Sequence, residues 1–448
     1  MNRLPHTNSL LAGEALFFLW LVVAALQLPA GASAQEAVRN TLAAQAAAET
    51  HPISLESMPY TFKTGDFRLL LAPSLGMDWN DNINLSRSDA LQDYIVEPML
   101  KLDASYPVTQ VNLLRLDVGV GYDEYLEHNN YSNWQVNSGS QLSFDTYIKD
   151  ILINLHDRFD YSQDPAGQAV VAGTGEYAVA HNVVGVTGSW NPKDMNMSLG
   201  YDHQNVMTPA GSFQSQDSSS ELIDGRVGWR FLPNATAGVE GTYSLTSYDQ
   251  AILNNSAAYT AGVYGDWQPG SYFKVEPRAG YVIYDFQQTS QSAETFEFTP
   301  TGAPIVMLTG KPIRTSDLNS WYADLTLSHD ITRSLKYALS VGHEIQAGIQ
   351  SDAIEDSYLR PSATWKIAKN LDLRGSFSYE HGQNGTGNIA GNLSENFDWY
   401  TGSVEINRQL TKKLRVGVNS RVTFRSSTTE ALGYTQALVG LQMAYAFE

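Results

Sequence analysis

The sequence predicts an all-β fold: a membrane-spanning antiparallel up-and-down β-barrel of about 18 strands, within a range of about 16 to 18. Two observations predict it. Apolar and polar residues alternate from about residue 66 to the C-terminus, in segments long enough to cross a membrane as tilted strands. The connectors between these segments are alternately short and long, as they are when one side of a barrel carries tight turns and the other carries extended loops.

The N-terminal part of the chain is expected to lie outside the barrel. A basic start, an apolar run over residues 15–28 and small residues at 32–34 are typical of a cleavable signal peptide, expected over 1–34. Residues 35–65 are expected to be a periplasmic tail, and their Ala-rich part favours a short helix. The alternative is that this helix enters the barrel as a plug. The barrel is expected to span residues 66–448.

The first three strands show the alternation most clearly. They are expected at 67–79, 93–106 and 111–126, each with aliphatic and aromatic residues on one face. Polar or small residues, such as Lys101 and Asp103, occupy the other face. A porin-type wall needs this pattern, because its apolar face contacts lipid and its polar face lines an aqueous lumen.

The remaining strands continue the same rhythm to the C-terminus. They are expected at 131–147, 150–162, 176–190, 194–206, 217–232, 235–249, 255–268, 271–287, 318–330, 333–348, 355–367, 370–382, 395–409, 413–426 and 433–447. Turn-forming residues, such as Pro233-Asn234 and Pro269-Gly270, occupy the tight connections. All the tight connections follow even-numbered strands, which places both ends of the barrel chain on the periplasmic side.

Composition and charge exclude several kinds of site. The 448 residues include no cysteine, so disulfides and thiolate metal sites are absent. Aromatic residues are abundant, with 24 Tyr and 9 Trp, which suit the water–lipid interface. The net charge of −19 argues against nucleic acid as a partner, because phosphate contacts need clustered basic residues. Soluble acidic loops account for this charge.

No enzyme is expected. The sequence has no nucleophile elbow, zinc-protease, phosphate-binding or dinucleotide motif. His156 and Asp157 are adjacent and therefore point to opposite faces of a strand. His156 and Asp160 share a face, and we interpret them as a satisfied pair in the lumen. We expect no catalytic residue, no metal site and no cofactor. A TonB-dependent transporter is disfavoured because its plug domain needs far more residues than precede the first strand.

The first hairpin resembles a known family. Residues 71–85 read LAPSLGMDWNDNINL and residues 93–102 read DYIVEPMLKL. This is similar to the opening of the putative β-barrel porin 2 family, which has a strand with a Pro-x-Leu/x-Gly pattern, an Asp-Asn-Ile/Leu loop and a proline in the second strand. The resemblance implies an outer-membrane barrel, with some relatives near exopolysaccharide gene sets, and it supplies no functional residues. The alternation over 439–447 is similar to the C-terminal signal for outer-membrane assembly, although Glu448 follows the usual terminal aromatic residue.

Six basic residues are expected to line one wall of the lumen. They are Arg360, Lys366, Arg374, Arg415, Arg421 and Arg425. Acidic residues, including Asp372, Glu380 and Glu405, share that wall, so the lumen is expected to be roughly balanced in charge. Cross-strand ion pairs that brace the wall are one interpretation. A basic strip that guides anions or acidic polysaccharide is the other.

The longest expected loop spans residues 288–317. Long loops without regular structure are often functional. Its apolar runs suggest a hairpin. One hypothesis folds it inward as a constriction that brings Glu294, Glu297, Lys311 and Arg314 to the pore. The other makes it an extracellular cap.

These observations favour a porin-like channel in the outer membrane of a Gram-negative-type envelope, reached through the signal peptide. Small hydrophilic solutes are expected to diffuse through it passively. The alternatives are a barrel associated with export of an anionic exopolysaccharide, and a non-conducting structural or surface-recognition barrel. Expected partners are outer-membrane lipid and lipopolysaccharide, the outer-membrane assembly machinery, and small solutes or polysaccharide. The sequence is compatible with an oligomer.

Overall fold

The computed structural model describes most of the chain. The described residues are 60–175, 177–209, 216–287, 291–298, 304–312, 317–347, 353–384 and 395–447. The expected signal peptide and most of the expected tail therefore lie outside them. No helix within the described ranges is long and apolar enough to cross a membrane.

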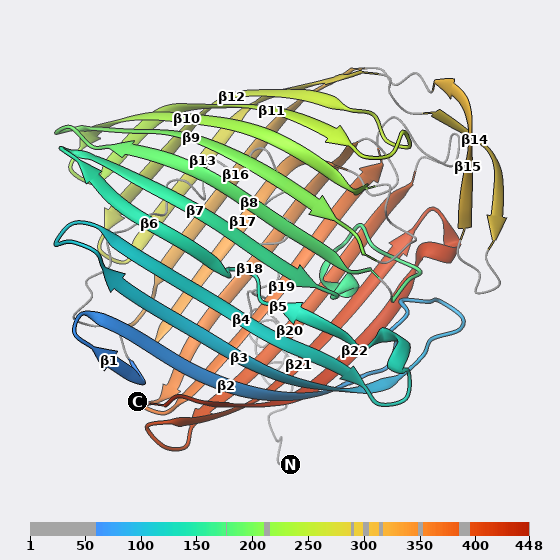
Figure 1. The fold of residues 1–448 in the computed structure, drawn as a ribbon, viewed down its shortest axis with the longest axis horizontal. Coiled ribbons are helices and arrows are strands. Elements are labelled where there is room, and N and C mark those ends of the chain that lie inside the picture. The colour runs from blue at the N-terminus through green and yellow to red at the C-terminus, as the bar shows by residue number, and fades with distance from the viewer. Residues whose placement is uncertain are drawn as a thin grey trace, which may run out of the picture.

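One sheet of twenty strands dominates the described part of the chain (Figure 1). Its strands are β1 (Phe62–Thr64), β2 (Phe67–Asn80), β3 (Asp93–Pro107), β4 (Leu113–Tyr125), β5 (Asn133–Val136), β6 (Gln141–Ile148), β7 (Ile151–Ser162), β8 (Val179–Trp190), β9 (Met195–Met207), β10 (Ser218–Leu232), β11 (Ala235–Tyr248), β12 (Ser256–Gly270), β13 (Phe273–Phe286), β16 (Leu318–Asp330), β17 (Leu335–Ala347), β18 (Ala353–Ala368), β19 (Leu371–Asn384), β20 (Asn396–Gln409), β21 (Leu414–Ser427) and β22 (Tyr434–Tyr445). Short 3-10 helices, η2 (Asn129–Tyr131), η3 (Pro165–Gly167) and η5 (Glu430–Leu432), lie in connections.

The sheet closes on itself as a barrel. Each strand pairs antiparallel with its neighbours, and β2 pairs with β22 from Ser74↔Ala444 to Asn80↔Leu438. Of the twenty described strands, β1 is a short addition to β2, and β5 and β6 together fill the place between β4 and β7. Eighteen wall positions remain, which confirms the predicted fold class.

Two local features differ from the expected strands. The strand expected over 131–147 is interrupted at residues 137–140, where Gly139 has a φ of +89° that favours glycine. Hydrogen bonds from the Asn137 backbone to Gly119 O and from Gly119 N to Ser140 Oγ replace the lost ladder bonds. The expected tail also contributes β1, which pairs with β2 before the barrel begins.

The two faces of the wall have the predicted chemistry. Apolar side chains on the outer face are highly exposed, as shown by Leu199 at 65% and Trp229 at 64%. A lipid-facing surface requires this exposure, because hydrocarbon takes the place of water around it. On the inner face, aromatic side chains lie flat across glycines of neighbouring strands. A Cβ atom at Gly262 or Gly280 would lie within 2.9 Å of Tyr322 atoms, so glycine makes room for that ring.

The two ends of the barrel differ, as the connector lengths predicted. Figure 1 shows short turns at one end and longer excursions at the other. We assign the end with short turns to the periplasm and the other to the exterior. Residues of the longest loop form β14 (Gln291–Phe298) and β15 (Pro304–Pro312), an antiparallel pair in a sheet of its own. The expected hairpin in this loop is confirmed, and it stands beyond the strand ends of the barrel (Figure 1).

Candidate functional site in the lumen

A connection between β7 and β8 enters the lumen near the exterior. This segment, residues 163–178, includes η3 and is called the inward segment below. Ala166 and Val171 of this segment pack with Leu85, which follows β2, and with Tyr434 of β22. Ala169 packs against Phe397 and Trp399 of β20, with Ile354 of β18 completing the cluster. The inward segment therefore crosses the lumen from β7 and β8 to the opposite wall.

An arginine on the opposite wall holds the start of the inward segment. Arg421 of β21 donates two hydrogen bonds to Asp164, from Nη1 to Oδ2 at 2.8 Å and from Nη2 to Oδ1 at 2.9 Å. Loss of water contacts acts to raise the pKa of Asp164, whereas the charge and hydrogen bonds of Arg421 lower it. The net effect is a lowered pKa, so Asp164 is ionised and the pair is charged at neutral pH.

A second arginine of β21 holds the middle of the inward segment. Arg425 is 1% exposed, and its Nη1 lies 2.8 Å from Glu395 Oε1. Its Nε donates to Ala169 O at 2.8 Å, and its Nη1 donates to Leu432 O at 2.7 Å. The guanidinium group also lies 4.4 Å from the centre of the Phe397 ring. The Arg425 side chain thus binds the inward segment at a backbone carbonyl, that of Ala169.

The Asp-Asn-Ile loop after β2 locks the closing seam of the barrel. Asn82 Nδ2 donates to Ser86 O within the loop and to Thr435 O of β22, each at 2.8 Å. Asp81 Oδ1 accepts a hydrogen bond from Ala437 N at 2.7 Å. The residues that carry the family resemblance here therefore join the first hairpin to the last strand, which is a structural role.

The six residues of the predicted basic strip all lie on the inner face of β18, β19 and β21. Four of them form ion pairs with acids. Their N···O distances are 2.6 Å for Arg360–Glu380, 3.8 Å for Arg374–Glu405, 2.8 Å for Arg421–Asp164 and 2.8 Å for Arg425–Glu395. Lys366 is exposed and Arg415 is half-buried, both toward the periplasmic end. Arg360–Glu380 joins β18 to β19 and Arg374–Glu405 joins β19 to β20, whereas Arg421 and Arg425 pair with acids outside the wall strands.

The predicted constriction residues lie on a different element from the inward segment. Glu294 and Glu297 belong to β14 and Lys311 to β15, whereas Arg314 lies outside the described residues. Sequence reasoning did not identify the segment that enters the lumen. Its signal was a run of small apolar residues over 165–175, which is unusual for a solvated loop.

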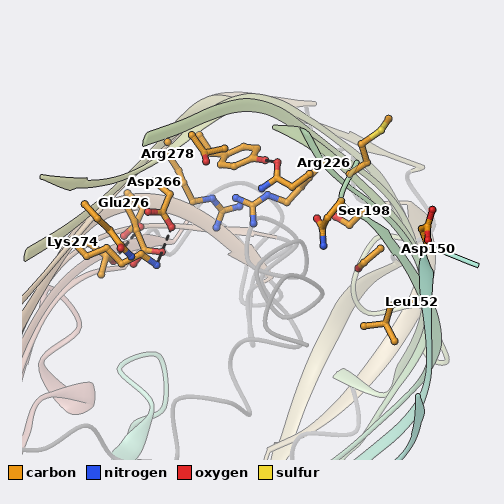
Figure 2. A pocket seen from close by; sticks show the side chains of 18 of the residues that line it. Asp150, Leu152, Ser198, Arg226, Asp266, Lys274, Glu276 and Arg278 are labelled. Carbon is orange, nitrogen blue, oxygen red and sulfur yellow. Dashed lines mark hydrogen bonds and ion pairs between the residues drawn. The ribbon is translucent and has the colours of Figure 1, made fainter. Parts of the chain in front are cut away.

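An open cavity of about 830 Å³ occupies the periplasmic half of the lumen. Figure 2 shows Arg226 and Arg278 side by side on one part of the wall, with Asp150 and Leu152 farther along the same curved wall. Both arginines bind Glu240 of β11, at 3.4 Å from Arg226 Nε and 2.9 Å from Arg278 Nη2. The wall of this cavity is therefore charged, in contrast to the apolar packing around the inward segment.

Further polar pairs cover the inner wall beside this cavity. Lys274 Nζ lies 3.1 Å from Asp266 Oδ2 and 2.6 Å from Glu276 Oε1, and Figure 2 shows the three side chains together. The expected pairing of His156 with Asp160 is wrong. His156 Nε2 lies 2.9 Å from Asp202 Oδ1, while Asp160 lies 3.2 Å from His181. Residues four apart on a strand are about 13 Å apart, so neighbouring strands supply nearer partners.

The described residues offer no obvious metal centre. No group of three or more His, Asp or Glu residues within them has the arrangement to hold a metal ion.

Comparison with solved structures finds several chains that are similar to this one. One is a loop-deletion mutant of OmpT, an outer membrane protein of Vibrio cholerae. Its alignment covers 85% of this chain and 100% of the OmpT chain, with 12% identity and a TM-score of 0.41. Pseudomonas aeruginosa OccK5 covers 85% and 98%, with 10% identity and a TM-score of 0.45. P. aeruginosa OccK2, solved in complex with glucuronate, covers 85% and 98%, with 9% identity and a TM-score of 0.46. No curated protein matches the chain.

A family model provides the assignment. The model described as "Putative beta-barrel porin 2" matches residues 59–294, which is more than half of the chain. Porins are typically not enzymes. The matched residues include the hairpin that carries the resemblance, from β2 to β3, and they extend into β14. The chain is an outer-membrane β-barrel that belongs to the putative β-barrel porin 2 family.

Proposed function

We propose that this protein is a channel through which small hydrophilic solutes cross the outer membrane by passive diffusion. The observation that carries the proposal is the open cavity of about 830 Å³ in the lumen of an 18-strand barrel. Barrels of this size have room for an aqueous channel. The inward segment narrows the lumen near the exterior and acts as the size filter, and the charged periplasmic cavity acts as the charge filter.

Conductance of the refolded protein in a planar lipid bilayer tests this proposal. We expect discrete conductance steps in KCl, with steps smaller than those of a barrel that lacks the inward segment. Folding is verified beforehand by β-sheet circular dichroism and by resistance to unfolding in SDS. Folded protein that inserts into the bilayer and carries no current would contradict the channel.

A non-conducting structural or surface-recognition barrel is the second candidate. The observation that favours it is the apolar packing of Ala166, Val171 and Tyr177 inside the lumen, because such packing leaves less space for water. The same bilayer measurement separates the two functions, since this candidate predicts no current from folded protein.

Export of an anionic polysaccharide has weaker support. A charged polymer needs a continuous row of accessible cations, and four of the six basic-strip residues are paired with acids. Constriction by Glu294, Glu297, Lys311 and Arg314 of the longest loop remains a proposal, and replacing that loop by a short linker tests it. Conductance that changes only slightly would assign the size filter to the inward segment.

We also propose that residues 1–34 are removed on export and that residues 35–65 remain as a periplasmic tail. N-terminal sequencing of the protein isolated from outer membranes tests the cleavage, and the expected first residue is Gln35. We propose further that the alternating last strand is recognised by the assembly machinery and that the barrel contacts lipopolysaccharide. Loss of outer-membrane insertion after deletion of residues 439–448 is the expected outcome for the strand.

A further inference from the structure

The basic side chains of the periplasmic cavity are buried in its wall. The side chains of Arg226 and Arg278 are 14% and 8% exposed. Both bind Glu240, and the guanidinium group of Arg226 lies 3.8 Å from the centre of the Tyr264 ring. The Tyr264 ring covers one face of the Arg226 guanidinium group, and Glu240 pairs with both arginines. These contacts use the parts of a guanidinium group that would otherwise bind a solute anion.

The acidic side chains of the same cavity are more accessible. The side chains of Asp266 and Glu276 are 41% and 36% exposed, and they share a single base, Lys274, at 34%. Asp150, at the turn between β6 and β7, is exposed and also lines the cavity (Figure 2). Three accessible carboxylates therefore face the cavity with one accessible ammonium group, so the accessible charge is negative.

We infer that the periplasmic cavity makes the channel prefer cations and that this cavity takes small organic ammonium ions, with Asp266 and Glu276 as the carboxylates that receive them. The inference rests on the proposed channel function and names its solute class. Lys274 already places an ammonium group against both of these carboxylates, so the ammonium group of a solute has the chemistry to bind there.

Ion selectivity in a bilayer under a KCl gradient tests the sign. We expect a reversal potential that shows potassium preference for the natural protein. The double variant Asp266→Asn/Glu276→Gln removes two accessible charges, and its potassium-to-chloride permeability ratio is expected to fall by about twofold or more. Asp157→Asn is the matched control, because Asp157 lies exposed on the outer face of β7 and its loss should leave the ratio unchanged.

Choline tests the solute class, because it carries a fixed positive charge and crosses lipid poorly. We expect choline to carry current through the natural protein and its relative permeability to fall in the double variant. Chloride preference, exclusion of choline, or a ratio equal in the double variant and the natural protein would each overturn this inference while leaving the channel in place. Absence of any current from folded protein would overturn the proposed channel itself.

Discussion

The two halves of the lumen share one wall but differ in what fills them. In the exterior half, the inward segment packs against Leu85 and Tyr434 and forms apolar clusters. In the periplasmic half, the wall faces an open cavity of about 830 Å³. The inner faces of the strands are polar in both halves, so the wall does not cause the difference. A connection that returns into the barrel causes it.

Two buried arginines show how each half uses the same kind of residue. Arg425 lies over Phe397 in the exterior half, and Arg226 lies over Tyr264 in the periplasmic half. Arg425 donates to Ala169 O of the inward segment, whereas Arg226 pairs with Glu240 of the neighbouring strand. Arg425 therefore holds the inward segment inside the lumen, which narrows it. Arg226 pairs with the barrel wall and leaves the lumen open beside it.

Removing the inward segment should have the largest effect on the difference between the exterior and periplasmic halves of the lumen. Replacing residues 165–175 by a short Gly-Ser linker deletes Ala166, Ala169 and Val171, which fill the exterior half. We expect single-channel conductance to rise several-fold, because the exterior half then resembles the open periplasmic half. Conductance equal to that of the natural protein would show that this segment does not limit the flow of ions. Circular dichroism checks that the barrel still forms.

Removing the second anchor should destabilise the exterior half. Arg425→Leu leaves Glu395, whose side chain is 8% exposed, without its cation. Breaking a buried ion pair in this way costs about 3–5 kcal/mol, which we expect as a lower unfolding midpoint in urea. Arg374→Leu is the control. The Arg374 side chain is 44% exposed and lies 3.8 Å from Glu405. An exposed ion pair of this kind contributes under about 1 kcal/mol to the free energy of unfolding. Equal midpoints for the two variants would contradict the anchoring role of Arg425.

A single methyl group in the wall should have a smaller effect. A Cβ atom at Gly280 would lie 2.4 Å from Tyr322 Cε1 and 2.5 Å from Ala261 O, so Gly280→Ala must displace the ring or the strand. Overpacking of this kind costs about 1–3 kcal/mol. Tyr322 also donates to Glu240 at 3.0 Å, so its displacement should alter the open cavity as well. Gly402→Ala, where no atom lies within 4 Å, should unfold at the same urea concentration as the natural protein.

Most of the wall could be predicted from the sequence because strand alternation is a local property. The strand expected over 318–330 coincides with β16 (Leu318–Asp330), and most other boundaries differ by one or two residues. Side chains of successive residues point to opposite faces, so the pattern also placed the basic strip on the inner wall. The exception at 137–140 arises where Gly139 takes a positive φ, a choice that a glycine permits but does not require.

The inward segment could not be predicted because its contacts are not local. Asp164 and Arg421 lie 257 residues apart, and nothing in the neighbourhood of either residue indicates the other. Small apolar residues over 165–175 suggested neither a strand nor a buried core, because a barrel lumen is expected to be wet. Residues 288–317 were chosen as a candidate constriction because they form the longest loop. Length does not determine whether a loop folds into the lumen, since this depends on its contacts with side chains of the barrel wall.

The sequence by itself determined that this protein is an antiparallel barrel, that it has about 18 strands and which side chains face inward. Local alternation and connector length are sufficient for these properties, since each follows from backbone geometry along one strand. Only the tertiary structure decided which connection enters the lumen, which arginines are buried and which carboxylates are accessible. These properties depend on distances between residues far apart in the chain, and closure of the barrel brings such residues together.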